Sequence, residues 1–230
     1  MSNTLRSGVE GWDNLRIIAC IPVYNEEELL KECLLNVEKY VDIILIIDGA
    51  YKNFDEDCTF STDKTLDIIT EFMVTSEIPV ILLPAKEWQS SMDKFNNFFT
   101  MFPCKTGDWM FLIDADDRIV ATETEWLEFK MTLQIVNEQY PLVQLGTINY
   151  VINNTHIPTK HLIKWNEAIR YGSNHSTWIN KNGETVDIEN KTVIYTDLVV
   201  ERLEHLRGSD RQNLKAIYNE RVRPFVETPE

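Results

Sequence analysis

Cysteine is scarce in this 230-residue sequence, and none of its four cysteines stands in a C-x-x-C pair. That spacing disfavours structural zinc sites and dithiol redox chemistry. Cys20 and Cys33 fall at apolar positions of a predicted strand and a predicted helix, so we interpret both as buried core thiols. The expected location is therefore a reducing, cytoplasmic compartment.

Long apolar runs are absent as well. No segment approaches the roughly 20 apolar residues that a membrane-spanning helix needs. Residues 1–15 are polar and charged, unlike the apolar core of a secretory signal. We expect a soluble protein without a transmembrane segment, which leaves peripheral membrane association open.

Basic residues are outnumbered, because 22 Lys and Arg stand against 37 Asp and Glu, for a formal net charge of −15. Nucleic-acid binding requires a basic surface, so no nucleic-acid partner is expected. A few local basic residues and a bound divalent metal can still reverse the potential around an anionic ligand. The hydrophobic content of 43% indicates a globular chain that can bury a sizeable core.

Short apolar segments alternate with amphipathic stretches in the first half of the chain. Buried strands are predicted over four ranges: 15–21, 41–47, 78–83 and 109–113. Helices are predicted between them, the third over residues 91–101. This alternation predicts a parallel α/β sheet in the first 117 residues.

The boundaries of these elements depend on single residues. Pro22 should end the first strand, because it cannot donate to an interior ladder. Asn25 with Glu28 resembles a capping box for the first helix. Ser61 or Thr62 should cap the second helix.

The second half of the chain lacks this alternation. Thr122 with Glu125 predicts a capping box before another helix, and residues 142–152 alternate weakly, as a strand does. A charged helix is expected over residues 209–222. No repeat or linker indicates an independent second domain.

Three carboxylates follow the predicted strand at 109–113, namely Asp114, Asp116 and Asp117. In open α/β sheets, ligands collect at the carboxyl ends of strands. Ionised carboxylates that lie close together repel each other unless a cation lies between them, and oxygen ligands suit Mg²⁺ or Mn²⁺. A metal site is one interpretation of this segment, and a polar turn that caps the next helix is the other.

Polar and aromatic residues also follow the other predicted strands, with Pro22, Tyr24, Asn25 and Glu26 after the first and Asp48 after the second. Neighbouring strand ends share one edge of the sheet, so we predict a nucleotide cleft there. Tyr24 would stack on a base, and Asp48 would accept hydrogen bonds from a base or a ribose. Alternatively, these residues only cap a helix and end a strand.

Four segments resemble, in order and spacing, those of family 2 glycosyltransferases: IPVYNEE at 21–27, IIDG at 46–49, STDKT at 61–65 and LIDADD at 112–117. The resemblance implies the GT-A fold, a mostly parallel central sheet flanked by helices, with a smaller mixed C-terminal part on the acceptor side. It implies a flexible arm over 1–15 and one domain over 16–224. The nucleotide-sugar-binding half would be 16–120 and the acceptor-side half 121–224.

The resemblance also implies ligands. A UDP- or GDP-linked sugar would lie across the strand ends, with Mn²⁺ or Mg²⁺ bridging its phosphates. Asp116 would bind the metal directly, and Asp114 would bind the ribose or the metal through water. Further matching positions are Lys94 and Asn97 on the donor side, Arg207 at the diphosphate or on a solvated helix, and His205 as a metal ligand or a buried histidine.

Members of this family commonly invert the anomeric carbon, which requires a base for the acceptor hydroxyl. The adjacent Glu-Asp pair found in many relatives is missing here, so Asp117, Glu167 and His175 all remain candidates. The second Asp usual after strand two is replaced by Gly49. The acceptor could be a glycan, a lipid-linked glycan or a protein.

Three other classes must be weighed. Phosphatases of the haloacid dehalogenase type also place D-x-D after a buried strand, but Thr or Val should then stand in place of Asp117. Sugar nucleotidyltransferases carry a Gly- and Arg-rich loop after the first strand, which this chain lacks. A catalytically degenerate nucleotide-sugar-binding domain is the non-enzymatic alternative.

Overall fold

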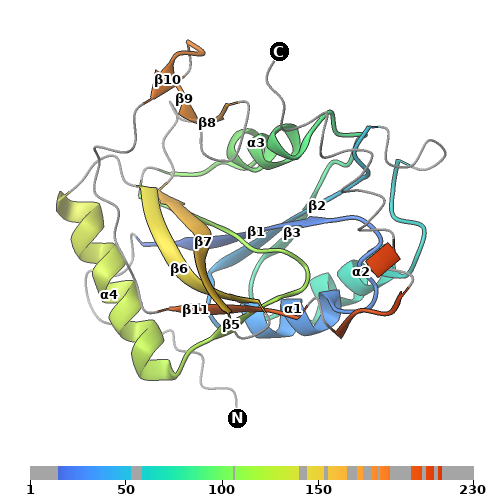
Figure 1. Cartoon of the computed structure of the whole chain (residues 1–230), viewed down its shortest axis with the longest axis horizontal. Coiled ribbons are helices and arrows are strands. Elements are labelled where there is room, and N and C mark those ends of the chain that lie inside the picture. Colours follow the sequence, from blue (N-terminus) through green and yellow to red (C-terminus); the bar gives the residue numbers. More distant parts are fainter. Residues whose placement is uncertain are drawn as a thin grey trace.

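A computed structural model gives the fold (Figure 1). The structure describes residues 15–52, 59–105, 107–139, 144–152, 155–164, 170–172, 178–180, 182–186, 198–203, 206–209 and 212–213. Residues 1–14 of the predicted arm and most of the predicted helix at 209–222 therefore lie outside the described residues.

One mixed sheet of eight strands runs through the molecule, in the order β3-β2-β1-β4-β7-β6-β11-β5. Its strands are β1 (Ile17–Val23), β2 (Ile43–Asp48), β3 (Val80–Leu83), β4 (Trp109–Leu112), β5 (Asp117–Val120), β6 (Gln144–Ile152), β7 (Thr155–Lys164) and β11 (Val199–Arg202). The first four strands pair in parallel, whereas β7 is antiparallel to both β4 and β6. The predicted parallel α/β half is confirmed.

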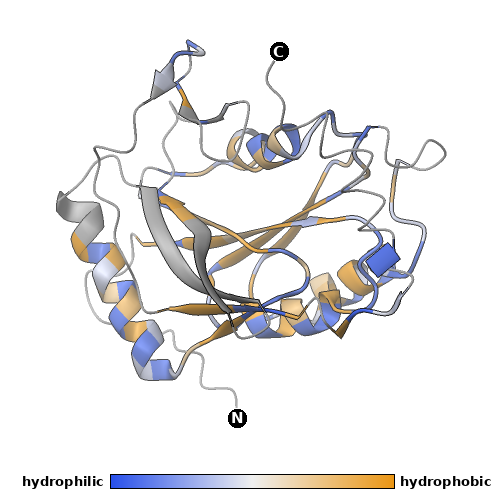
Figure 2. Cartoon of the chain, in the orientation of Figure 1, coloured by the Kyte–Doolittle hydropathy of each residue, from blue (hydrophilic) through white to orange (hydrophobic). Residues whose placement is uncertain are grey.

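Helices cover both faces of this sheet. The four helices of the described part are α1 (Leu30–Val37), α2 (Thr65–Thr75), α3 (Ser91–Met101) and α4 (Glu123–Gln139). Buried side chains of α1, α2 and α4 join one apolar cluster with one face of the central strands, and α3 packs on the opposite face. The central strands are largely hydrophobic, as expected for a sheet covered on both faces (Figure 2). None of these helices combines the length and apolarity of a membrane span.

A second, three-stranded sheet consists of β8 (Arg170–Tyr171), β9 (Trp178–Ile179) and β10 (Thr185–Val186). Its first strand lies against α3, where the guanidinium of Arg170 stands 5.8 Å from the centre of the Phe99 ring. This small sheet belongs to the half of the chain for which the acceptor side was predicted.

The structure corrects three predicted boundaries. Pro22 does not end β1, because it pairs with Ile47 and the strand continues to Val23. Backbone groups of residues two apart along a strand face the same neighbour, and Cys20 directs its carbonyl to the β4 side. The missing N–H of Pro22 therefore faces the side where β4 has already ended at Leu112.

The other two corrections concern helix starts. The first helix begins at Leu30 rather than at Asn25, and the second begins at Thr65, after Lys64 rather than after Ser61 or Thr62. The side chains expected to cap these helices bind other segments instead, as described below. The capping box at the start of α4 is confirmed, since Glu125 accepts from the backbone and hydroxyl of Thr122, and the Thr122 hydroxyl accepts from the Glu125 amide.

Candidate functional site

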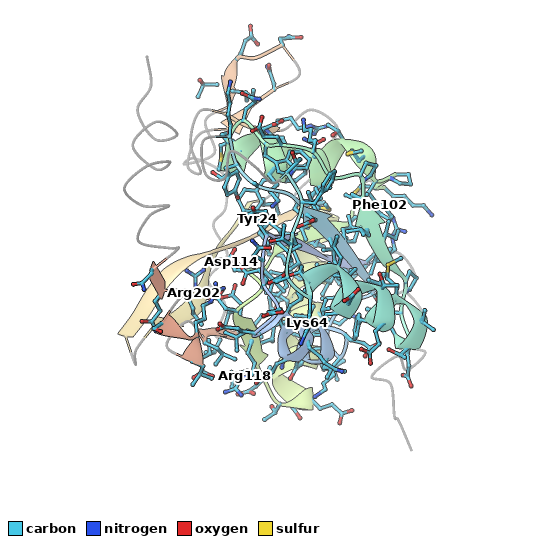
Figure 3. The ribbon with its side chains drawn as sticks, turned by 90° about the vertical axis from the view of Figure 1, so that its right-hand side faces the viewer. Tyr24, Lys64, Phe102, Asp114, Arg118 and Arg202 are labelled. Atoms are coloured by element: carbon cyan, nitrogen blue, oxygen red, sulfur yellow. The ribbon has the colours of Figure 1, made fainter. Side chains whose placement is uncertain are left out.

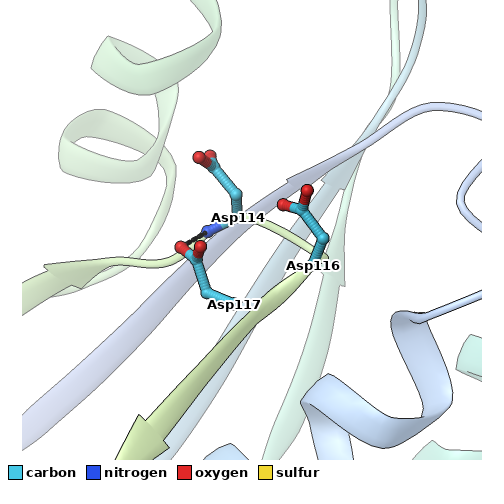
Figure 4. Close-up of side chains that lie close together, drawn as sticks. All are labelled: Asp114, Asp116 and Asp117. Atoms are coloured by element: carbon cyan, nitrogen blue, oxygen red, sulfur yellow. Dashed lines mark hydrogen bonds between the residues drawn. The ribbon is translucent and has the colours of Figure 1, made fainter. Parts of the chain in front are cut away.

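The segment between β4 and β5 turns sharply and brings three carboxylates together. The Asp117 carboxylate accepts the Asp114 backbone N–H at 2.8 Å, and the Asp117 N–H donates to the Asp114 carbonyl at 3.0 Å (Figure 4). Carboxylate oxygens of Asp114, Asp116 and Asp117 all lie within 4.8 Å of one another. The Asp114 side chain is 36% exposed, whereas those of Asp116 and Asp117 are buried. Asp117 therefore holds the turn, and Asp114 offers the most accessible carboxylate.

Two arginines from the C-terminal segment neutralise part of this charge. Arg202, the last residue of β11, donates to Asp114 and lies 3.6 Å from an oxygen of Asp117 (Figure 3). Arg207 places Nη2 3.1 Å from an Asp116 oxygen and 2.9 Å from a Glu26 oxygen. The loop after β1 and the end of the chain's described part thus meet at the aspartates.

The loop after β1 is bonded to the segment that precedes α2. Asn25 adopts a left-handed conformation with φ of 52°, its N–H donates to the Ser61 hydroxyl, and its side-chain oxygen accepts from the Thr62 N–H. The N–H of Glu26 donates to the Thr65 hydroxyl at 2.6 Å. Two of the side chains predicted as helix caps, those of Asn25 and Ser61, are used in these bonds, which hold the backbone next to Glu26 in place.

Asp48 and Tyr24 lie deeper than predicted. Asp48 is completely buried, and its two carboxylate oxygens accept from the hydroxyl and the N–H of Ser61 at 2.6 and 3.0 Å. Tyr24 is 8% exposed, which leaves little ring surface for stacking in this conformation. Asp48 therefore ties the end of β2 to the segment before α2, and neither side chain is open to a ligand in this conformation.

Position 49, where many relatives have a second aspartate, has no space for a side chain. Its φ is +125°, and a Cβ atom built there would lie 2.3 Å from the Lys86 carbonyl oxygen. The Trp88 indole N–H also approaches closely and donates to the Asp48 carbonyl at 2.9 Å. An aspartate therefore does not fit at position 49 in this packing.

Lys94 is buried where β1 and β2 end. Its Nζ donates to the Val23 carbonyl at 2.8 Å and to the Gly49 carbonyl at 2.7 Å. Burial lowers the pKa of Lys94 to about 7, although the carboxylates of Asp48 and Glu26 act in the opposite direction. Asn97, one turn later, donates to the Asp93 carbonyl on its own helix at 2.7 Å.

Several donor-side residues predicted from the sequence thus lie near the ends of β1, β2 and β4, and Arg207 contacts Asp116. Their roles in binding a donor stay predictions. Arg202 was not predicted, because an arginine that follows Val199, Val200 and Glu201 carries no distinguishing sequence signal. Three predicted residues lie outside the described residues: Glu167, His175 and His205.

The carboxylate cluster fits the divalent metal that the resemblance implies. Its donors are oxygens only, which is the ligand type that Mg²⁺ and Mn²⁺ prefer. Asp114 and Asp116 are the residues that would hold the ion, since one Asp117 oxygen already accepts the Asp114 N–H.

Comparisons with known proteins give the chain a family. A family model described as glycosyl transferase family 2 matches residues 18–185. A TPR repeat-containing protein of Synechococcus elongatus is 27% identical over 118 residues, which make up 51% of this chain and 24% of that protein. The chain therefore spans about a quarter of the length of that relative.

Among solved structures, S. aureus TarS 1–349 matches 63% of this chain and 38% of its own, with a TM-score of 0.42 and 19% identity. The structure of TarS 1–349 in complex with UDP-GlcNAc matches with the same TM-score, and mannose-6-phosphate isomerase from Helicobacter pylori matches 89% of this chain with a TM-score of 0.35 and 12% identity. All three scores are below 0.5, so these likenesses carry no weight for function. The family model covers well over half of the residues, and the α/β sheet agrees with the GT-A fold: the chain belongs to glycosyl transferase family 2.

Proposed function

We propose that this chain transfers a sugar from a UDP- or GDP-linked donor to a hydroxyl of a glycan, lipid-linked or protein acceptor. The observation that carries the proposal is the cluster of Asp114, Asp116 and Asp117 at the end of β4. It stands at the carboxyl edge of parallel strands, where ligands bind in such sheets. Membership of glycosyl transferase family 2 supports a nucleotide-sugar donor.

The residues around the cluster suit a diphosphate. A divalent ion held by Asp114 and Asp116 would neutralise the charge that develops on the departing diphosphate. Arg207 offers a guanidinium, whose planar fork matches phosphate oxygens. Lys94 fixes the ends of β1 and β2 relative to each other, so the loops above them keep one geometry.

Of the three predicted bases for the acceptor hydroxyl, Asp117 is the one whose contacts the structure describes. Asp117 is buried, with one oxygen bonded to the Asp114 N–H and the other facing Arg202, so it supports the turn instead. We therefore propose Glu167 or His175, in the acceptor-side half, as the group that takes the proton from the acceptor hydroxyl. Single displacement with inversion needs one such base.

Thermal unfolding tests the donor site directly. The chain is heated with UDP, GDP or neither, each with and without Mn²⁺, as wild type, Asp116→Asn and Asp67→Asn. Asp67 is an exposed aspartate of α2 and serves as the matched control. A ligand at 100 times its Kd should stabilise the protein by about 2.7 kcal/mol, a shift of a few degrees.

The expected result is a shift that needs nucleotide and metal together, persists in Asp67→Asn and disappears in Asp116→Asn. The nucleotide that gives the shift names the donor class. Absence of a shift with every nucleotide would contradict the donor-site assignment.

A second candidate is a domain that binds a nucleotide sugar without transferring it. The observation that favours it is the structural engagement of Asp117, which removes one of the three predicted bases. Release of UDP or GDP from donor sugars separates the two functions. Transfer predicts release that falls at least about 100-fold in Glu167→Gln or His175→Ala with donor binding preserved, because a positioned base contributes 10²–10⁴-fold. His156→Ala, a histidine outside the family-like segments, serves as the control and should leave the rate of release unchanged.

A further inference from the structure

Arg202 stands where a cation would neutralise the aspartates. Its guanidinium donates to Asp114, and its Nε lies 3.6 Å from an Asp117 oxygen and 3.9 Å from an Asp116 oxygen. One side chain thus faces all three carboxylates of the cluster, and it is only 17% exposed. A guanidinium in this place does electrostatically what a metal ion would do, without coordination bonds.

The backbone that carries Arg202 is fixed. Arg202 pairs with Asp117 in the antiparallel ladder between β11 and β5, and the next N–H, that of Leu203, donates to the Asp116 carbonyl at 2.7 Å. The segment cannot leave the aspartates without breaking the sheet. The side chain, however, is long and can turn away from the carboxylates while the strand stays in place.

The described members of this network do not balance in charge. Four carboxylates, those of Glu26, Asp114, Asp116 and Asp117, share the guanidiniums of Arg202 and Arg207. The formal sum is −2, which one divalent cation would neutralise. Because the Arg202 guanidinium already lies against all three aspartates, an ion that coordinates them must displace it from these contacts. Arginine binds carboxylate and phosphate with the same planar fork, so a diphosphate can take it over.

We propose that Arg202 is an exchangeable counter-ion: it holds the aspartates in the ligand-free chain and moves to the donor's diphosphate when a divalent ion binds them. The proposal rests on the proposed function and adds to it a coupling between the two ligands. A metal ion that binds alone displaces the guanidinium and gives it no new partner, which costs free energy. A nucleotide that binds alone has to draw the guanidinium away from the aspartates, which also costs free energy. Each ligand therefore raises the affinity for the other by the same factor.

Mn²⁺ binding measured by electron paramagnetic resonance tests this without any turnover. Free Mn²⁺ is titrated into wild type, Arg202→Gln and Arg118→Gln, each with and without UDP or GDP. Arg118 is the matched control, because it lies in the adjacent strand β5 and pairs with Glu201 and Glu32, outside the cluster.

In wild type we expect weak Mn²⁺ binding that tightens about 5–150-fold with nucleotide, the usual range of such coupling. Arg202→Gln should bind Mn²⁺ alone at least about fivefold tighter than wild type and should lose most of the coupling, whereas Arg118→Gln should behave as wild type. Weaker or unchanged binding of Mn²⁺ alone by Arg202→Gln would overturn the proposal.

Failures of the two proposals are distinguishable, because the titration of metal alone needs no nucleotide. Tighter Mn²⁺ binding by Arg202→Gln without any nucleotide effect in wild type would support the competition at the aspartates and overturn the donor assignment. If Arg202→Gln does not fold, as judged by circular dichroism, Arg202→Lys is used in its place. Its ammonium cannot form the planar fork, so an intermediate Mn²⁺ affinity is expected, and one equal to wild type would overturn the proposal.

Discussion

The amine of Lys94 is buried where β1 and β2 end. Among the described residues, the hydrogen-bond partners of its Nζ are backbone carbonyls and not carboxylates. Lys94 donates to two backbone carbonyls, that of Val23 at the end of β1 and that of Gly49 directly after β2. A neutral amine still has two hydrogens, enough for both bonds. The strand ends can therefore stay fixed whether or not the amine carries a proton.

This gives a signed pH dependence. Burial lowers the pKa of Lys94 to about 7 in the folded chain, below its ordinary value of 10.5. Between these values the unfolded chain binds more protons at this site, so its contribution to the free energy of unfolding rises with pH. Between pH 7 and 9, the free energy of unfolding of wild type should therefore rise by about 2 kcal/mol relative to that of Lys94→Met. The slope is at most about 1.4 kcal/mol per pH unit.

Urea unfolding at pH 6, 7, 8 and 9 measures this difference. Lys86→Met is the matched control, because Lys86 is half exposed and lies eight residues earlier. Its curve should run parallel to wild type over the whole range. If Lys94→Met also ran parallel, Lys94 would keep its charge in the folded chain.

At the same scale, the sequence predicted which carboxylates would gather but not what would neutralise them. Asp114 and Asp116 follow a fully apolar strand, and that position is visible without a structure. Arg202 reaches them only because β11 pairs with β5, from a distance of 88 residues along the chain. Local patterns contain no information about such a pairing.

The loop after β1 and the segment before α2 act as one unit. Besides the bonds of Asn25 and Glu26, the Glu27 N–H donates to Asp63 and the Lys64 N–H donates to the Glu27 carboxylate. Each segment thus supplies the other's backbone with partners that its own helix would otherwise provide. The predicted caps were wrong: Asn25 and Ser61 do accept backbone N–H groups, but these groups belong to the other segment, which local spacing cannot reveal.

Asn25 is the residue on which this unit can be tested. Its φ of 52° costs little for Gly or Asn and about 1–2 kcal/mol for Ala, and its side-chain oxygen bonds to the Thr62 N–H. Asn25→Asp should keep wild-type stability within about 0.5 kcal/mol, Asn25→Gly should lose about 1 kcal/mol for the hydrogen bond, and Asn25→Ala about 2 kcal/mol. Urea unfolding at one pH ranks the three, and equal losses for Gly and Ala would exclude backbone strain at this position.

Across the whole molecule, the first four strands were predicted closely because each is a short apolar segment, and a helix follows each of the first three. The mixed part was not, since β5 is short and polar at its start, and β11 joins it from the far end of the described chain. The sheet order therefore depends on contacts between distant segments. These same contacts bring acidic residues together in a chain that is already strongly acidic.

That excess charge makes a final prediction. With a formal charge of −15, repulsion among surface carboxylates should destabilise the folded chain at low salt, where the screening length is about 30 Å in 0.01 M NaCl. Raising NaCl to 0.15 M shortens that length to about 8 Å, so the free energy of unfolding should rise. Glu87→Lys, at an exposed position, reduces the charge to −13 and should lessen the salt response. A fall in stability with salt would instead mean that attractive ion pairs, mainly those of Arg202 and Arg207, outweigh the repulsion. In that case Arg202→Gln should lose less stability with added salt than wild type does.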